Sequence, residues 1–245
     1  MNYHIVYSVS KIFKMKSLPI IALIPARNGS IGIKNKNIVY LKNKHLIEYS
    51  FLEATKSKLI NKVFLSTNDH RVIKIAKKYK KIEIILRNKQ LSNSSALLQD
   101  VLCDSILTIK KNLNLKNFNL ILLQPTSPLR KVKDINNAIL LFKKDKKSKT
   151  LASVSTPINH PYEFLYYENH KLKKLINSKK NTNRQNLKKF FFVNGNIYIL
   201  DANEFLKKKI FIDKNTKIFK MDKKFSLELD DYDDLKMMKG LMNDL

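Results

Sequence analysis

Apolar runs and amphipathic stretches alternate along the chain up to residue 144. Runs of strand length predict strands at residues 20–24, 62–67, 82–87 and 119–124. Apolar side chains at helical spacing predict helices at residues 45–58, 70–79, 95–113 and 134–144. Asp69 directly precedes the second helix and is expected to cap it. This alternation predicts an α/β fold, with a mostly parallel sheet between two layers of helices.

The pattern changes after residue 150. Further strands are predicted at residues 150–156, 190–200, 217–221 and 225–230, before a final helix. Residues 164–176 indicate a β-hairpin that turns near Asn169 and His170. We expect residues 157–190 to be a small insertion on the main sheet. The expected organisation is an N-terminal extension, residues 1–18, followed by one domain, residues 19–245.

Polar loops follow four of the predicted strands, at residues 25–37, 66–69, 87–95 and 124–130. The carboxyl ends of parallel strands meet at one edge of a sheet, and open α/β folds bind their ligands there. We therefore expect the four loops to open on a single site.

The first of these loops combines glycine with positive charge. It contains Arg27, Gly29, Ser30, Gly32, Lys34 and Lys36. The small residues allow the backbone to approach an anion and to offer N–H donors, and the cations suit a triphosphate. The loop has the spacing of neither a Walker A motif nor G-x-G-x-x-G. On loop composition alone, a plain strand-to-helix turn stays an open alternative.

Five of the 20 carboxylates of the chain lie within residues 228–234. On the predicted strand 225–230, Glu228 and Asp230 would point to the same face. Two carboxylates on one face form an oxygen-rich seat for Mg²⁺. The other three are expected to cap and charge the start of the last helix, namely Asp231, Asp233 and Asp234.

The formal charge of +28 at first suggests a nucleic-acid partner. The 43 lysines, however, are spread over every segment with no basic–aromatic stripe, so we expect a solvated lysine surface and no nucleic acid. Arginine is rare in comparison, and in such a chain an arginine indicates a need for its planar fork. The five arginines are Arg27, Arg71, Arg87, Arg130 and Arg184.

The single cysteine, Cys103, excludes a disulfide framework and a cysteine-based metal site. No run approaches the length of a membrane span. Lys11, Lys14 and Lys16 interrupt any signal-like apolar stretch near the start. We therefore expect a cytoplasmic protein with no membrane partner.

Six segments, in order, resemble the motifs of one enzyme family. They are IPARNGSIGIKNKNI, FLSTND, ILRNKQLS, LLQPTSPLR, NRQNLKKFFFVNGNIYI and SLELDDYDD. Over residues 19–240, the chain resembles the CMP-N-acylneuraminate (nonulosonic acid) cytidylyltransferases, which include the CMP-sialic, legionaminic and pseudaminic acid synthetases. LLQPTSPLR is the most specific of the six segments.

The resemblance implies a Rossmann-like nucleotidyltransferase fold and a homodimer. The aromatic side chains of the hairpin insertion cannot all be buried against one sheet, so we expect residues 157–190 to carry the dimer contacts, with a lid over the pocket as the alternative. The resemblance implies transfer of CMP from CTP to the anomeric hydroxyl of an acidic nine-carbon sugar, with pyrophosphate released. It also implies Mg²⁺ as cofactor, with Asp230 and Glu228 as the metal ligands.

The resemblance also implies roles for individual residues. The catalytic positions are Arg27, Lys36 and Asp230. The nucleotide-binding positions are Ala26, Arg27, Asn28, Gly29, Ser30, Asn37 and Arg87. The sugar-binding positions are Gln124, Thr126, Arg184 and Tyr198. Two arginines are expected elsewhere, Arg130 as a structural anchor of its loop and Arg71 on an exposed helix.

Some positions depart from the family pattern. Ile31 stands where lysine is usual, and Ser94 and Glu228 stand where aspartate is frequent. Asn196 replaces an alanine and is expected to point near the sugar pocket. Three alternatives stay open: a cytidylyltransferase for the eight-carbon acidic sugar of lipopolysaccharide, a basic nucleic-acid-binding protein, and a non-catalytic homologue.

Overall fold

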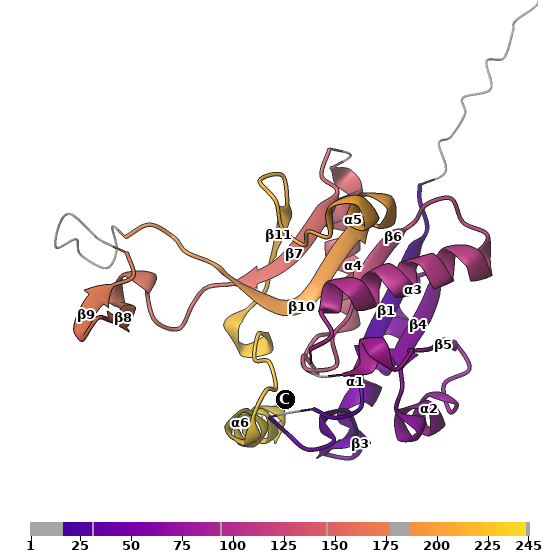
Figure 1. Ribbon diagram of the computed structural model, residues 1–245, viewed down its shortest axis with the longest axis horizontal. Coiled ribbons are helices and arrows are strands. Elements are labelled where there is room, and N and C mark those ends of the chain that lie inside the picture. Colours follow the sequence, from indigo (N-terminus) through magenta and orange to yellow (C-terminus); the bar gives the residue numbers. More distant parts are fainter. Residues whose placement is uncertain (1–16, 31, 94, 146, 177–186, 244–245) are drawn as a thin grey trace, which may run out of the picture.

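A seven-stranded sheet forms the centre of the molecule, in the order β11-β7-β10-β6-β1-β4-β5 (Figure 1). This computed structural model describes residues 17–30, 32–93, 95–145, 147–176 and 187–243. The strands are β1 (Ile20–Ala26), β4 (Lys62–Thr67), β5 (Ile82–Leu86), β6 (Asn119–Leu122), β7 (Thr150–Ser155), β10 (Phe192–Asp201) and β11 (Lys217–Lys220). β10 runs antiparallel to β6 and β7, and the other pairs are parallel. The expected extension lies largely outside the described residues.

Helices cover both faces of this sheet (Figure 1). One face carries α1 (Leu46–Lys56), α2 (His70–Ala76) and α4 (Val132–Lys144), whose apolar side chains share a buried cluster with β1 and β4. The other face carries α3 (Leu98–Leu113) and α5 (Ala202–Lys208) over a second cluster. The predicted three-layer α/β/α arrangement with a mostly parallel sheet is therefore confirmed.

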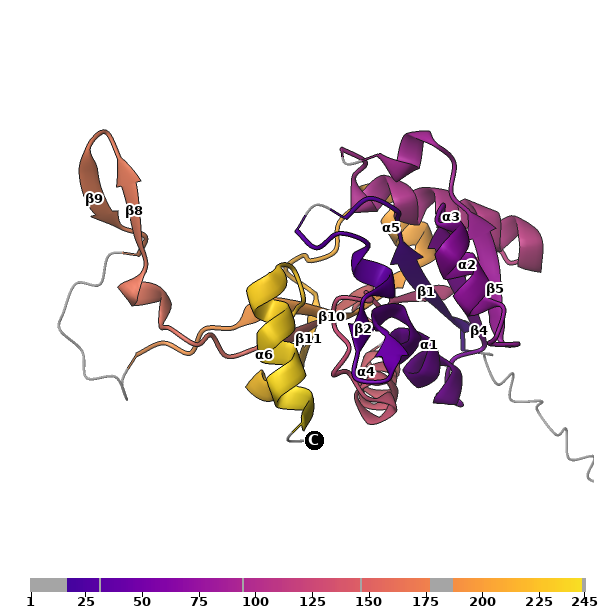
Figure 2. The same cartoon turned by 90° about the horizontal axis from the view of Figure 1, so that it is seen from below.

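A third apolar cluster lies beside the loop that follows β1. It joins the last helix, α6 (Tyr232–Asn243), to the small hairpin of β2 (Tyr40–Leu41) and β3 (Lys44–His45). Ile33 and Leu41 pack there with Leu229 and Met238, all of them fully buried. Figure 2 shows α6 alongside this first loop. The C-terminal segment is thereby held against the polar edge of the sheet.

The predicted strand at residues 225–230 is wrong. The chain forms a short 3₁₀ helix, η5 (Lys223–Phe225), and then an irregular segment up to Asp230. The alternation of apolar and polar residues comes from the burial of Leu227 and Leu229 against the third cluster, not from pairing with a strand. The N–H of Leu229 donates to the carbonyl of Thr126 at 2.9 Å, which fastens the segment to the loop after β6.

The predicted hairpin in residues 164–176 is confirmed as β8 (Leu165–Glu168) and β9 (Lys171–Lys174). Asn169 and His170 both have positive φ, 50° and 59°, which suits a two-residue turn. The hairpin stands away from the sheet in both views (Figures 1 and 2). Its side chains are exposed on both faces.

Arg130 is the largest side chain in the fully buried part of the core. Its guanidinium donates to the carbonyl of Asn196, to Ser50 Oγ at 2.8 Å and to the carbonyl of Gln124 at 3.2 Å. Burial lowers its pKa to about 10. The expected role of Arg130 as a structural anchor is confirmed, since it ties α1, β10 and the loop after β6 together.

We predict that Arg130→Lys destabilises the fold, because one ammonium cannot reach three acceptors from β10, α1 and the β6 loop. Leaving buried acceptors unpaired should cost about 2 kcal/mol, which lowers the melting temperature of a chain of this size by about 4–8 °C. Thermal unfolding measures this, with Lys133→Arg, a charge-conserving exchange at an exposed position nearby, as the control. Equal melting temperatures for Arg130→Lys and the wild type would contradict the anchor.

Candidate active site

Four polar loops meet at one edge of the sheet, as the sequence predicts. β6, β1, β4 and β5 are parallel neighbours, so the loops after them open on the same side. The start of β10 reaches this edge as well, because β10 runs antiparallel to β6. A cavity of about 400 Å³ opens there. Its lining residues are Pro25, Arg27, Ser30, Gly32, Lys36, Asn37, Gln124, Pro125, Thr126 and Asp230.

The cavity brings together most of the predicted site residues. Those that line it are Arg27, Ser30, Lys36, Asn37, Gln124, Thr126 and Asp230. Three more are their immediate neighbours in the chain, Ala26, Asn28 and Gly29. Arg87, Tyr198 and Glu228 lie outside the lining, and Arg184 lies outside the described residues.

The first loop is fixed at both ends by side-chain hydrogen bonds. Near its start, the N–H of Asn28 donates to Asn68 Oδ1 at 2.8 Å. Near its end, Asn37 Nδ2 donates to the carbonyl of Arg27 at 3.0 Å. The loop then enters a 3₁₀ helix, η1 (Lys36–Ile38), directly after Asn35, which has a left-handed φ of 57°. These contacts therefore define the path of the chain from the end of the buried strand β1 to the cavity.

Arg71 lies exposed on α2, as expected, but its guanidinium also contacts the first loop. Its guanidinium donates to Asn28 Oδ1 at 3.2 Å and to Asn35 Oδ1 at 3.1 Å. Exposure alone was predictable from the polar face of α2. The contact with a loop some 40 residues earlier was not, because no local pattern encodes it.

Lys36 and Asp230 form an ion pair at the mouth of the cavity. Lys36 Nζ lies 3.0 Å from Asp230 Oδ1. The lysine side chain is 13% exposed and the aspartate side chain 71% exposed, so much of the carboxylate faces open space. A Cβ on Gly32 would overlap the backbone carbonyl of Asp230. Glycine at this position is what lets the first loop and the C-terminal segment come together.

Glu228 and Asp230 do not form the predicted same-face pair, because residues 225–230 are not a strand. The Glu228 carboxylate lies against the backbone of Gly195, where a Cβ would overlap Glu228 Oε1. Gly195 has a φ of +63°, so both space and backbone conformation favour glycine there. Within the described residues, Glu228 Oε1 is buried and has no hydrogen-bond partner.

The pKa of Glu228 is raised to about 7. Burial is the largest cause, and the negative charges of Asp230 and Asp234 add to it, while Lys36 acts in the opposite direction. The two predicted metal ligands therefore influence each other electrostatically although their side chains differ in exposure.

These two carboxylates fit a magnesium ion in part. The orphaned Glu228 oxygen lacks a cation or donor, and Asp230 offers an open carboxylate at the cavity. No group of three or more His, Cys, Asp or Glu side chains suited to a metal occurs in the described ranges. Mg²⁺ commonly binds one or two carboxylates and takes its remaining ligands from substrate phosphates and water. The site thus fits a metal that arrives with a phosphorylated substrate.

Arg87 is held beside the first loop but does not reach the cavity wall. Its Nε donates to Ser66 Oγ at 3.2 Å, and its Nη2 donates to the Ser66 carbonyl at 2.9 Å. Its pKa is lowered to about 10, first by burial and then by the nearby positive charge of Arg27. The two arginines therefore lie close enough to repel, which concentrates positive charge at this end of the edge.

The predicted sugar-binding residues fall into two groups. Gln124 and Thr126 line the cavity, and Gln124 Nε2 donates to the carbonyl of Gly195 at 3.2 Å. Tyr198 instead packs on Phe211, with ring centroids 5.2 Å apart, in the cluster under α3 and α5. Burial raises the pKa of Tyr198, and the charge of Glu228 adds to the shift. Tyr198 therefore adjoins the site from the core side.

Asn196 does not point into the cavity, contrary to expectation. It is fully buried, and its Nδ2 donates to the carbonyl of Asn194 at 3.1 Å. Asn196 lies where the register of β10 against β7 shifts, between Val193 and Tyr198. The asparagine that replaces alanine is satisfied only in part, because its Oδ1 is buried and has no hydrogen-bond partner within the described residues.

Comparison with known proteins agrees with this geometry. A sequence profile described as "Cytidylyltransferase" matches residues 21–242. The chain belongs to the cytidylyltransferase family. Among curated relatives, the N-acylneuraminate cytidylyltransferase of Streptococcus agalactiae is 31% identical, covering 87% of this chain and 51% of that protein. The CMP-N,N'-diacetyllegionaminic acid synthase of Campylobacter jejuni is 30% identical, covering 91% and 95%.

Solved structures support the same fold. A CMP:2-keto-3-deoxy-manno-octonic acid synthetase complexed with CTP aligns with a TM-score of 0.68 over 92% of this chain and 99% of that one, at 14% identity. The predicted Rossmann-like nucleotidyltransferase fold is confirmed. The chain spans about half the length of the streptococcal relative but nearly all of the Campylobacter relative.

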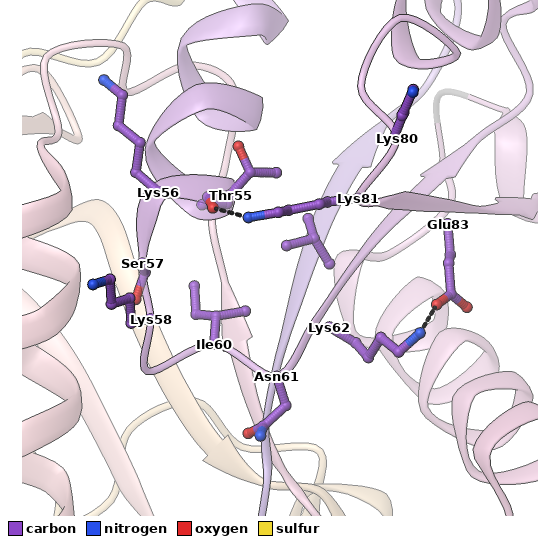
Figure 3. A pocket seen from close by; sticks show the side chains of 12 residues that line it. Thr55, Lys56, Ser57, Lys58, Ile60, Asn61, Lys62, Lys80, Lys81 and Glu83 are labelled. Atoms are coloured by element: carbon purple, nitrogen blue, oxygen red, sulfur yellow. Dashed lines mark hydrogen bonds and ion pairs between the residues drawn. The ribbon is translucent and has the colours of Figure 1, made fainter.

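The chain has a second, larger pocket of about 850 Å³ at the opposite edge of the sheet (Figure 3). Five lysines line it, but several are already engaged. Lys62 pairs with Glu83 at 2.6 Å, and Lys81 donates to the carbonyl of Thr55 at 3.4 Å. The pocket lies at the amino ends of β4 and β5, away from the loops that carry the family motifs. The smaller cavity is therefore the candidate active site.

The raised pKa of Glu228 predicts a pH-dependent stability. Between pH 4.5 and about 7, the unfolded chain ionises Glu228 while the folded chain keeps its proton, so rising pH destabilises the fold in this window. Glu228→Gln removes this effect. We expect the melting temperature of the wild type, measured in chelator, to fall relative to that of Glu228→Gln as the pH rises from 5 to 8. A constant difference across this range would contradict the raised pKa.

Proposed function

We propose that this chain transfers CMP from CTP to the anomeric hydroxyl of an acidic nine-carbon sugar, releasing pyrophosphate. The single observation that carries the proposal is the 400 Å³ cavity, where the first loop, the Gln124–Thr126 segment and Asp230 meet. The names of the relatives, which act on N-acylneuraminate and on diacetyllegionaminic acid, support the substrate class.

The first loop is suited to the triphosphate of CTP. Arg27, Ser30 and Lys36 line the cavity and offer two cations and a hydroxyl to phosphate oxygens. The reaction needs the sugar hydroxyl to attack the α-phosphorus in line while pyrophosphate leaves, so the protein mainly has to position reactants and neutralise charge. Lys36 is already held in place by Asp230. In this proposal Asn37 and Ala26 shape the nucleotide side of the loop.

Arg87 is proposed to lie near the cytosine rather than the phosphates. Its two hydrogen bonds to Ser66 fix the guanidinium plane at the end of β5, one strand beyond β4. A fixed planar fork suits a base edge, which needs two directed hydrogen bonds.

The sugar is proposed to lie on the Gln124 side of the cavity. Gln124 and Thr126 would contact it directly, and Tyr198 would support this wall from the core. Arg184 is proposed to bind the sugar carboxylate, because a bidentate guanidinium–carboxylate pair would orient the anomeric hydroxyl.

Asp230 and Glu228 are proposed to hold Mg²⁺. The ion, when bound, would neutralise charge on the phosphate oxygens. Glu228 must be ionised to serve as a ligand, and its pKa of about 7 makes its charge available from neutral pH upward.

We also propose a homodimer formed through the β8–β9 hairpin, and action in the cytoplasm, where CTP is available. A two-stranded hairpin standing alone is only marginally stable in water. Leu165, Tyr167 and Leu172 expose 52%, 69% and 66% of their surface on it. A partner surface would cover these side chains. Among the described helices, none combines the length and apolar character needed to cross a membrane.

The proposed activity is tested by incubating the protein with CTP, Mg²⁺ and a panel of nine-carbon acidic sugars, with the eight-carbon acid and UTP as comparisons. We predict that Asp230→Asn lowers pyrophosphate release at least about a hundredfold, the scale of losing one key charge-stabilising group. Asp233→Asn is the matched control, since Asp233 is 88% exposed and pairs only loosely with Lys236, at 3.7 Å. Near-normal release by Asp230→Asn at saturating Mg²⁺ would reject the metal assignment.

The dimer is tested by sedimentation at micromolar concentration. Tyr167 and Leu172 face each other across the hairpin, so Tyr167→Asp with Leu172→Asp should give a monomer while the wild type is a dimer. Leu107→Asp, which changes a leucine on α3 that is 58% exposed, should leave the dimer intact. A monomeric wild type would reject the proposal.

A further inference from the structure

Arg71 and Asp69 form a rigid unit at the start of α2. Asp69 caps the helix by accepting the N–H of Arg71 at 3.0 Å. The Arg71 side chain then turns back on the same carboxylate, with Nε 3.0 Å from Oδ1 and Nη2 2.8 Å from Oδ2. Burial disfavours the charged form of Asp69, but the hydrogen bonds from Arg71 outweigh burial and lower its pKa. The guanidinium is therefore fixed in orientation although its side chain is 46% exposed.

The unit is anchored to the end of β4. The N–H of Asp69 donates to Thr67 Oγ1 at 3.1 Å, and Thr67 Oγ1 donates to the carbonyl of Ala26 at the end of β1. Thr67 and Asp69 are both buried. The position of the Arg71 guanidinium is thus set by the sheet itself.

From this fixed position, Nη2 of Arg71 contacts both ends of the first loop. It lies 3.2 Å from Asn28 Oδ1 and 3.1 Å from Asn35 Oδ1. Its two hydrogens are shared among these amides and Asp69. Asn28 directly precedes Gly29 and Ser30, and Asn35 directly precedes Lys36 and Asn37. The contact therefore links the two parts of the loop that line the cavity.

The contact between Arg71 and Asn35 affects where the next residue, Lys36, is placed. Its φ of 57° is left-handed, a conformation in which glycine is the least strained residue. Asparagine tolerates it better than most other residues and brings an amide that Arg71 can hold. Because η1 begins at the next residue, holding Asn35 sets where Lys36 enters the cavity.

We propose that Arg71 is a positioning residue for the nucleotide: it clamps Asn28 to Asn35 and so holds the first loop in its binding conformation. Arg71 is not part of the cavity lining, so it acts through the loop and not by touching the ligand. The inference rests on the proposed function for its ligand, CTP, but the clamp itself is a property of the free protein.

The first experiment measures the clamp without substrate. Hydrogen–deuterium exchange of peptides covering residues 27–37 should be faster in Arg71→Ala than in the wild type. Lys74→Ala is the matched control, because it removes a cation one turn further along the same helix. We expect no change in exchange over residues 27–37 for that control. Unchanged exchange in Arg71→Ala, or an equal increase in Lys74→Ala, would overturn the clamp.

The second experiment measures its effect on the nucleotide. Arg71→Ala and Arg71→Lys should both raise the KM for CTP about tenfold, the effect of losing a net hydrogen bond to a charged group, with little change in the KM for the sugar. Lysine keeps the charge but cannot hold Asp69 and two amides together. Normal CTP affinity in Arg71→Lys would show that charge alone matters and would overturn the proposal.

A double-mutant cycle with Asn35→Gly tests whether Arg71 works through the loop. Glycine keeps the left-handed backbone and removes the acceptor. The combined variant should lose at least about threefold less CTP affinity than the product of the two single losses, because the shared contact can be lost only once. Independent, multiplying effects would overturn the clamp. If the wild type neither binds nor turns over CTP, the proposed function fails, while the exchange measurement still decides the role of Arg71.

Discussion

The buried guanidinium of Arg130 is the interaction on which the active-site edge depends. Removing a charge from water is costly, so a cation in the core needs hydrogen-bond acceptors. Nη1 and Nη2 of Arg130 have them, whereas its Nε has none within the described residues. These acceptors are main-chain or hydroxyl oxygens of β10, α1 and the β6 loop, with no carboxylate among them. Three segments must therefore keep one mutual position. That position places Gln124 and the start of β10 at the cavity.

Arg130, Arg87 and Arg71 are three of the four arginines in the described residues. Each of them uses its planar guanidinium to join different parts of the fold. Arg130 joins core segments, Arg87 is fixed on Ser66 at the end of β4, and Arg71 joins α2 to the first loop. In each case one guanidinium bonds to two or more acceptors, which a lysine ammonium would satisfy with less directional control. The scarcity of arginine in a lysine-rich chain thus indicated structural precision as well as anion binding.

Much of the fold was predictable because its signals are local. The alternation of apolar runs with helical spacing gave the parallel core, and Asp69 before an apolar helix gave a cap that the structure contains. The α5 helix was missed, although Asp201 followed three residues later by Glu204 is a helix-start signal. The prediction of a strand at residues 225–230 was wrong, because the alternating burial of Leu227 and Leu229 does not require a partner strand.

The site was predictable in location but not in its contacts. Four strand-end loops were expected at one edge, and they are there. The long-range contacts were not readable: Arg71 with Asn35, Lys36 with Asp230, and Glu228 with Gly195 each join residues that are far apart in the chain. The local sequence shows which residues a loop contains, whereas long-range packing, on the sheet for Arg71 and on the third cluster for the C-terminal segment, decides what they contact.

The charged side chains at the cavity neutralise each other, and a charged ligand could replace either partner of the ion pair. Lys36 and Asp230 are each other's counter-ion, and because the Asp230 side chain is 71% exposed, water screens the pair and limits its contribution to stability. Either partner can therefore turn to a ligand of opposite charge at small cost.

Glu228 differs, because its oxygen is buried against Gly195 with no partner within the described residues, and its proton is held until near neutral pH. An anionic ligand accompanied by a cation would match both features at once, because Lys36 could bind the anion while Asp230 and Glu228 could hold the cation. The charges of Lys36, Asp230 and Glu228 would thus suit the cation–phosphate pair of the proposed function better than either ion alone.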